Sequence, residues 1–127
     1  EIWLIYPCNP FLNKNLLNFA AKSFKKNNNF PLMSMKEYEA PIEWALSKKK
    51  NYFVPISKKN LLIDSKKIKK KYYESGSFVI FKQNQIINKK IHSKYNGFIL
   101  KRENAVDIDT IEDWKLAENL YKLKKLK

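Results

Sequence analysis

Apolar and polar positions follow two different periods along this chain, and each period predicts one kind of element. Short apolar or alternating runs predict strands at 2–6, 32–38, 77–82 and 97–100, with weaker strands at 41–48, interrupted by its proline, and at 52–56. The run at 2–6 is uniformly apolar, so we expect a buried strand that ends at Pro7.

Apolar residues that recur every three or four positions predict amphipathic helices. The helix at 13–26 has an apolar face of Leu16, Leu17, Ala20 and Phe24. The helix at 110–123 has an apolar stripe of Ile111, Trp114, Ala117, Leu120 and Tyr121. The lysine-rich stretch 64–73 predicts a third, solvated helix that ends at Gly76. Strands alternating with helices indicate an α/β fold, and 127 residues correspond to one domain over 1–127.

The composition indicates a folded protein and excludes several classes of site. Because 44% of the residues are hydrophobic and 14% aromatic, the chain can form a core. No apolar run is long enough to span a bilayer, and no signal peptide is visible. Cys8 is the only cysteine and His92 the only histidine, which excludes an internal disulfide and zinc motifs. We expect a cytoplasmic protein in which Cys8 is a small buried or half-buried thiol rather than a nucleophile.

The net charge of +14 raises nucleic acid as a partner. Almost all of this charge comes from lysine, whereas arginine, the commonest specific base reader, occurs only as Arg102. The chain is also rich in Asn and Ile, which together with Lys are what an AT-rich genome tends to encode. We therefore interpret most lysines as solvated surface, whose field would attract an anionic substrate such as a nucleotide or an acidic sugar. A basic nucleic-acid-binding module remains an alternative.

Two acidic residues, Asp107 and Asp109, directly precede the last predicted helix. In a strand they would project to the same face. Neighbouring carboxylates raise one another's pKa unless a cation lies between them, and Mg²⁺ is typically held by one or two carboxylates plus phosphates. Alternatively, both only flank a helix start, where Thr110 would be the N-cap and Asp113 its capping-box partner. The spacing alone leaves both interpretations open.

A glycine-rich phosphate-binding loop is absent from this sequence. Gly76 and Gly97 are its only glycines, which excludes the Walker loop and the G-x-G-x-x-G motif. A triphosphate needs backbone N–H groups or clustered cations around it. The sequence therefore contains a candidate metal site without a phosphate cradle.

Four blocks resemble, in order, the cytidylyltransferases that make CMP-activated nonulosonic acids, namely the CMP-sialic acid synthetases and the pseudaminic acid enzymes. Three of them are I-Y-P-C-N-P-F-L at 5–12, Y-E-A-P-I-E-W-A-L at 38–46 and Y-Y-E-S-G-S-F at 72–78. The most specific block is V-D-I-D-T-I-E-D-W at 106–114, which is similar to the family's V-D-I-D-T-P-E-D-W/F. The block at 38–46 resembles the pseudaminic acid branch.

The resemblance implies a Rossmann-like nucleotide-diphospho-sugar transferase sandwich with a mixed sheet, usually a homodimer. It implies transfer of CMP from CTP to an acidic nine-carbon sugar, with release of pyrophosphate. Asp107 and Asp109 match the family's catalytic pair that binds Mg²⁺. Five further residues fall where the family contacts the nucleotide or the sugar: Tyr6, Asn9, Ser75, Gly76 and Ser77.

The sequence departs from the family at its N-terminal signature, a glycine-, arginine- and lysine-rich CTP-binding loop, which is absent. Val79 also stands where a tyrosine is common, and Trp44 replaces a basic residue. We therefore expect a C-terminal portion of the fold, incomplete at its N-terminus and inactive alone. A second hypothesis is a non-catalytic remnant or interaction protein that keeps the fold and whose unpaired sheet edge invites a partner.

Overall fold

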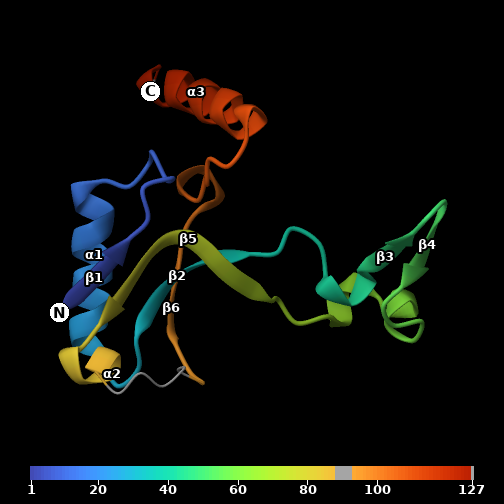
Figure 1. Cartoon of the computed structure of the whole chain (residues 1–127), viewed down its shortest axis with the longest axis horizontal. Helices are drawn as coiled ribbons and strands as arrows, with labels where there is room; N and C mark the ends of the chain where they lie inside the picture. Colours follow the sequence, from blue (N-terminus) through green and yellow to red (C-terminus); the bar gives the residue numbers. More distant parts are fainter. Residues whose placement is uncertain (88–92, 127) are drawn as a thin grey trace. The chain divides into compact units, whose positions relative to one another are not determined.

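The computed structural model describes residues 1–87 and 93–126, so His92 lies outside the described residues. The chain forms two compact units (Figure 1). The first contains Glu1–Lys36 and Glu74–Lys127, and the second contains Glu37–Tyr73. No helix in the described part of the chain is long and apolar enough to cross a membrane.

A four-stranded sheet with the order β1-β5-β2-β6 lies at the centre of the first unit. β1 (Ile2–Ile5) pairs antiparallel with β5 (Tyr72–Phe81), and β2 (Leu32–Glu37) pairs parallel with β6 (Asn96–Ile99). This mixed sheet and its helices confirm the predicted α/β fold class with a mixed sheet.

The prediction that the first strand is buried is wrong. Ile2, Leu4 and Ile5 are 41%, 46% and 48% exposed. Among the described residues, β1 has a neighbour on one side only, so its apolar side chains lie at the rim of the sheet.

The helix α1 (Lys14–Lys26) covers the sheet as its period predicts. Asn13 caps its start, because its side-chain oxygen accepts the N–H of Leu16 at 3.0 Å. The core cluster is formed by Ala20, Phe24, Leu32, Phe78, Ile80, Leu100 and Ala105, against which Leu16 and Leu17 also pack. The predicted apolar face of this helix is therefore confirmed.

The last helix, α3 (Ile111–Lys125), begins with the predicted capping box between Thr110 and Asp113. The prediction that its apolar stripe faces the core is largely wrong. Ile111, Trp114 and Tyr121 are more than half exposed, and only Ala117 is buried. The reason is that the helix packs on a small satellite cluster rather than on the sheet. This cluster contains Phe11, Val106, Ile108, Ala117 and Leu120. A further helix, α2 (Gln83–Ile87), is too short to show a period and was not predicted.

The second unit contains the antiparallel hairpin of β3 (Leu46–Lys49) and β4 (Tyr52–Pro55). The strand predicted at 41–48 is thus only partly correct, since a 3₁₀ turn at Ile42–Trp44 precedes β3. The strand predicted at 52–56 is confirmed.

The helix predicted at 64–73 is wrong. Only a 3₁₀ turn at Ser65–Lys67 forms, capped by the Asp64 carboxylate, and the chain then becomes extended and enters β5. The lysines here surround a single aliphatic residue, Ile68, so a helix would have no apolar face to pack against the protein. Tyr72 and Tyr73 instead favour a strand. The glycine expected to end this helix, Gly76, consequently lies within β5.

Phe24 should carry more of the stability of the first unit than Phe19 on the same helix. Phe24 is 2% exposed and Phe19 is 65% exposed. We expect Phe24→Ala to lower the free energy of unfolding by about 3–5 kcal/mol because it leaves a cavity. The matched control Phe19→Ala should change it by less than about 1 kcal/mol. Urea unfolding of both variants measures this, and equal losses would contradict the described core.

Candidate functional site

Three segments that are distant in the sequence meet at one end of the sheet, and Asn9 joins them. The buried side-chain amide of Asn9 donates to the hydroxyl of Ser77 at 2.7 Å and to the backbone carbonyl of Asn104 at 2.8 Å. Its carbonyl oxygen accepts the N–H of Phe11 at 2.9 Å. The turn after β1, the middle of β5 and the segment 104–109 are therefore fixed to one another, as expected if the matched blocks form one site.

The side chains of Ser75 and Ser77 are buried and take part in a hydrogen-bond network. The hydroxyl of Ser75 donates to the hydroxyl of Ser34 at 2.8 Å, and that hydroxyl both donates to and accepts from the backbone of Phe78 at 2.9 Å. Ser75 and Ser77 are 5% and 0% exposed. In this arrangement both serines hold the backbone of β5 around Gly76. That Asn9, Ser75 and Ser77 touch a substrate stays a prediction.

Gly76 and Asp107 are in close contact. Gly76 has a φ of +65°, and a Cβ atom placed on it would lie 2.5 Å from Oδ2 of Asp107 and 3.1 Å from its Cγ. Only a glycine can adopt this conformation easily and leave room for the carboxylate. Asp107 lies in an irregular segment, not in the strand considered from the sequence. This segment is anchored by the N–H of Ile108, which donates to the carbonyl of Cys8 at 3.0 Å.

The surroundings of Asp107 disfavour its charged form. Burial raises the pKa of Asp107 above its ordinary value, and the charges of Asp109 and Asp113 raise it further. The Asp113 carboxylate is already hydrogen-bonded. It accepts from the N–H of Thr110 at 2.9 Å and from the Thr110 hydroxyl at 2.7 Å. These hydrogen bonds lower the pKa of Asp113. Asp107 and Asp109 thus form a like-charged pair whose repulsion no hydrogen bond from a described residue relieves.

The pair offers only carboxylate oxygens, which are the ligands that Mg²⁺ and Ca²⁺ prefer. Among the described residues, no group of three His, Cys, Asp or Glu side chains could hold a metal ion. A protein-only cage is therefore not formed by this part of the chain. Two carboxylates fit the common arrangement in which Mg²⁺ is completed by water and phosphate oxygens.

Tyr6 lies at the same end of the sheet, where its N–H donates to the carbonyl of Ser77 at 3.0 Å. Burial raises the pKa of the Tyr6 hydroxyl, and the charge of Glu74 and a side-chain hydrogen bond to it act in the same direction. Glu74 was not selected from the sequence, although it lies in the block at 72–78, because its neighbour Tyr6 is far from it in the sequence.

Lys124 connects α3 to the candidate site and was also missed. Its ammonium donates to Oδ1 of Asn104 at 2.7 Å and to the carbonyl of Glu103 at 2.9 Å, and it lies 4.0 Å from the centre of the Phe11 ring. Burial lowers the pKa of Lys124, partly offset by the charge of Glu103. The two hydrogen bonds cross about twenty positions of sequence and the ring contact crosses far more, so no local pattern could indicate them.

An apolar groove of about 210 Å³ adjoins the acidic pair at Ile108. It is lined by Pro10, Phe11, Ile108, Trp114, Ala117, Glu118 and Tyr121. The exposed part of the α3 stripe therefore forms one wall of a groove.

No family model matches the chain. The chain is similar to two proteins named pseudaminic acid cytidylyltransferase from Campylobacter jejuni subsp. jejuni, one of serotype O:23/36 (strain 81-176) and one of serotype O:2. It is 32% identical to each over 128 residues, which cover 97% of this chain and 54% of each relative. The predicted resemblance to this family is confirmed, and the chain spans about half the length of these relatives.

Replacing Gly76 by alanine should destabilise the protein because it strains the backbone and displaces the Asp107 carboxylate. We expect Gly76→Ala to lower the free energy of unfolding by about 1–3 kcal/mol. Gly97→Ala is the matched control, since the atom nearest to its Cβ is the sulfur of the flexible Met35 side chain at 3.2 Å. Urea unfolding measures both. A Gly76→Ala protein as stable as the wild type would contradict the close contact.

Asp109→Asn should lower the pKa of Asp107 toward its ordinary value, but not fully, since burial remains the largest cause of the raised pKa. A carboxyl group with a raised pKa in the folded state stabilises the fold below its unfolded pKa and loses that contribution as pH rises through the folded pKa. The pH dependence of stability in this range should therefore weaken in Asp109→Asn. A carbon-13 NMR titration of Asp107 measures the shift, with Glu112→Gln as the control. An unchanged pKa in Asp109→Asn would show that the two carboxylates do not interact.

Proposed function

We propose that this relative of the pseudaminic acid cytidylyltransferases forms part of an enzyme that transfers CMP from CTP to a nonulosonic acid and releases pyrophosphate. The observation that carries the proposal is the close approach of Asp107 to Gly76, together with the charge of Asp109 that acts on Asp107. These residues come from two separate blocks of the sequence resemblance, and Asn9 from a third block ties the segments together. The names of the relatives favour pseudaminic acid or a close relation as the sugar.

Asp107 and Asp109 would hold Mg²⁺ in this proposal. When bound, the ion supplies positive charge that neutralises the phosphates and orients the attacking group. The contribution of this chain is to position the pair. Gly76 leaves space for the Asp107 carboxylate, and the capping box engages the Asp113 carboxylate in hydrogen bonds with Thr110. Tyr6 with Glu74 lies at the same end of the sheet and would face the nucleotide or the sugar.

The phosphate cradle for CTP would come from polypeptide that this chain does not contain. The chain spans 54% of each relative and has only two glycines, neither in a phosphate-binding motif. We therefore expect the chain alone to bind a cation but not to transfer CMP. A nucleotide substrate and a single cysteine agree with a cytoplasmic location.

We also propose that the working enzyme is a homodimer, with the second unit as its contact surface. Large apolar side chains of the hairpin and the turns after it are exposed by between 50% and 89%: Leu46, Tyr52, Phe53, Ile56 and Leu62. A unit of this size cannot cover such surface by itself, and apolar patches of this kind mark interaction sites. Sedimentation of the active protein tests this, and a monomer would remove this part of the proposal.

The function is tested with a chimera in which this chain replaces its matching portion in the relative from strain 81-176. We expect the chimera to transfer CMP from CTP to pseudaminic acid in the presence of Mg²⁺. Asp107→Asn and Asp109→Asn should each lower kcat about 100-fold or more, because the ion loses a ligand. Glu112→Gln, an acidic neighbour outside the pair, should leave the rate unchanged. Undiminished turnover in both aspartate variants would remove the metal assignment.

A further inference from the structure

Lys124 occupies a position on α3 at which the helical period predicts an apolar side chain. It lies two helical turns after Ala117, which is buried in the satellite cluster with Phe11. This position instead brings an ammonium to 4.0 Å from the centre of the Phe11 ring. The same ammonium donates to Oδ1 of Asn104 and to the carbonyl of Glu103. One side chain of α3 thus contacts two other segments of the protein.

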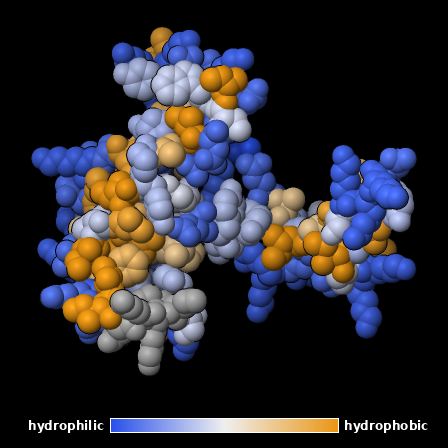
Figure 2. All heavy atoms as spheres, viewed as in Figure 1, coloured by the Kyte–Doolittle hydropathy of each residue, from blue (hydrophilic) through white to orange (hydrophobic). Residues whose placement is uncertain are grey.

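Few apolar contacts attach α3 to the rest of the described chain. Ala117 is its one buried residue, and Leu120 is the other α3 side chain in the satellite cluster. Ile111 and Leu116 are more than half exposed. Figure 2 shows apolar and hydrophilic side chains side by side over the helix that Figure 1 labels α3. The attachment of this helix therefore depends on the contacts of Lys124 more than that of a helix with a buried face would.

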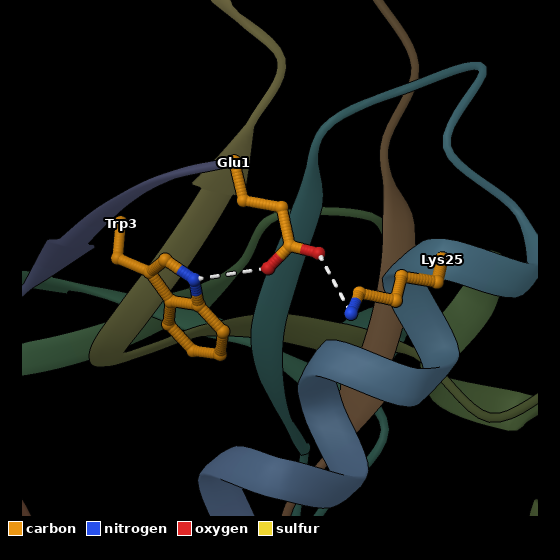
Figure 3. Close-up of polar contacts among 3 residues, drawn as sticks. All are labelled: Glu1, Trp3 and Lys25. Atoms are coloured by element: carbon orange, nitrogen blue, oxygen red, sulfur yellow. Dashed lines mark hydrogen bonds and ion pairs between the residues drawn. The ribbon is translucent and has the colours of Figure 1, made fainter.

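Lys25 on α1 provides a comparison, because its contact is an ordinary surface ion pair. Its ammonium lies 4.0 Å from the Glu1 carboxylate, which also accepts the indole N–H of Trp3 at 3.4 Å (Figure 3). The Lys25 side chain is 74% exposed, so this pair contributes little to stability. Lys124 differs, because its two oxygen acceptors lie at 2.7 Å and 2.9 Å, within hydrogen-bond distance.

Lys124 and Asn9 hold the same two segments. The side-chain amide of Asn9 donates to the backbone carbonyl of Asn104 and accepts the N–H of Phe11. Lys124 contacts the side-chain oxygen of Asn104 and the ring of Phe11. Asn104 is therefore held both through its backbone and through its side chain. Because Asp107 follows three positions later, a displacement of Asn104 would move the segment that carries the acidic pair.

The acidic pair also lies within a loop that Lys124 closes. The hydrogen bond from Lys124 to Asn104 spans twenty positions of sequence, and both aspartates lie between its ends. Inside this loop the N–H of Ile108 donates to the carbonyl of Cys8 at 3.0 Å. Joining the ends of a loop restricts the conformations of the residues between them.

We propose that Lys124 is a positioning residue: it attaches the last turn of α3 to the turn before the acidic segment, so that Asp107 and Asp109 bind a divalent cation more tightly. An apolar residue at this position would leave Oδ1 of Asn104 and the carbonyl of Glu103 without this donor. The inference rests on the proposed function for the nature of the ligand.

The charge of Lys124 and its positioning role predict opposite effects of removing the ammonium. A positive charge repels a cation, so through charge alone Lys124→Met would strengthen cation binding. Through position, the same substitution weakens cation binding because it opens the loop. Methionine keeps an unbranched stem that can lie on the Phe11 ring, so this variant isolates the lost hydrogen bonds.

Mn²⁺ binding by the full chain, followed by electron paramagnetic resonance, measures the effect. We expect Lys124→Met to weaken Mn²⁺ binding about tenfold, as is typical when a group that orients a metal ligand is lost. Lys124→Arg should keep most of the affinity, because a guanidinium can donate to the same oxygens and stack on Phe11. Two controls remove the same charge and should bind like the wild type. They are Lys122→Met, on the same turn but without a hydrogen bond or ion pair to the described residues, and Lys25→Met.

Amide hydrogen exchange without metal measures the position of the acidic segment independently. In Lys124→Met the N–H of Ile108 should exchange faster than in the wild type, and Lys124→Arg should restore its protection. The N–H of Tyr6, which donates to the carbonyl of Ser77 at 3.0 Å, should not change. Circular dichroism and urea unfolding check that every variant remains folded.

Equal or tighter Mn²⁺ binding by Lys124→Met, or unchanged exchange at Ile108, would overturn the proposal. Absence of Mn²⁺ binding by the wild type would remove the metal assignment and the proposal with it. Weaker Mn²⁺ binding by Lys124→Met in a chain whose chimera does not transfer CMP removes the proposed function and leaves the positioning role intact. An active chimera together with unchanged Mn²⁺ binding by Lys124→Met removes only the positioning role.

Discussion

The side-chain amide of Asn9 is the interaction on which the candidate site depends. Its hydrogen bonds to Ser77 and to the carbonyl of Asn104 join the turn after β1 to β5 and to the segment before α3. Both of these partners lie more than sixty positions from Asn9 in the sequence. Because a buried amide that loses a partner leaves an unsatisfied polar group, this arrangement resists small displacements. The position of Asp107 is therefore set by contacts far from it in the sequence.

The surrounding backbone fixes the position of Asp107, although the charged form of its carboxylate is unfavourable there. Gly76 leaves the space in which the Asp107 carboxylate lies, while burial and the neighbouring carboxylates raise its pKa. Structural carboxylates are usually paired with cations or hydrogen-bond donors, as Asp113 is in the capping box. A partly buried carboxylate that has an acidic neighbour and no such partner is a candidate for cation binding. The fold thus maintains an electrostatic cost that a bound cation would remove.

The sequence predicts those elements of the fold that depend on neighbouring residues only. The period of Leu16, Leu17, Ala20 and Phe24 gave α1, and the Thr110–Asp113 spacing gave the start of α3. The helix predicted at 64–73 does not form, because the lysines there surround only Ile68 and provide no apolar face to pack. The contact of Gly76 with Asp107 has no local signal, since a glycine inside a strand pattern shows neither its φ nor its neighbour. Lys124 and Glu74 were missed because their roles depend on which segments the sheet brings together.

The central proposal is that Asp107 and Asp109 together bind a divalent cation. The most direct measurement is anomalous diffraction from crystals of the protein grown with Mn²⁺ and CTP. We expect an anomalous peak within about 2.3 Å of an oxygen of each carboxylate, beside Gly76. A peak at another place, or two carboxylates turned away from each other with no metal between them, would contradict the claim.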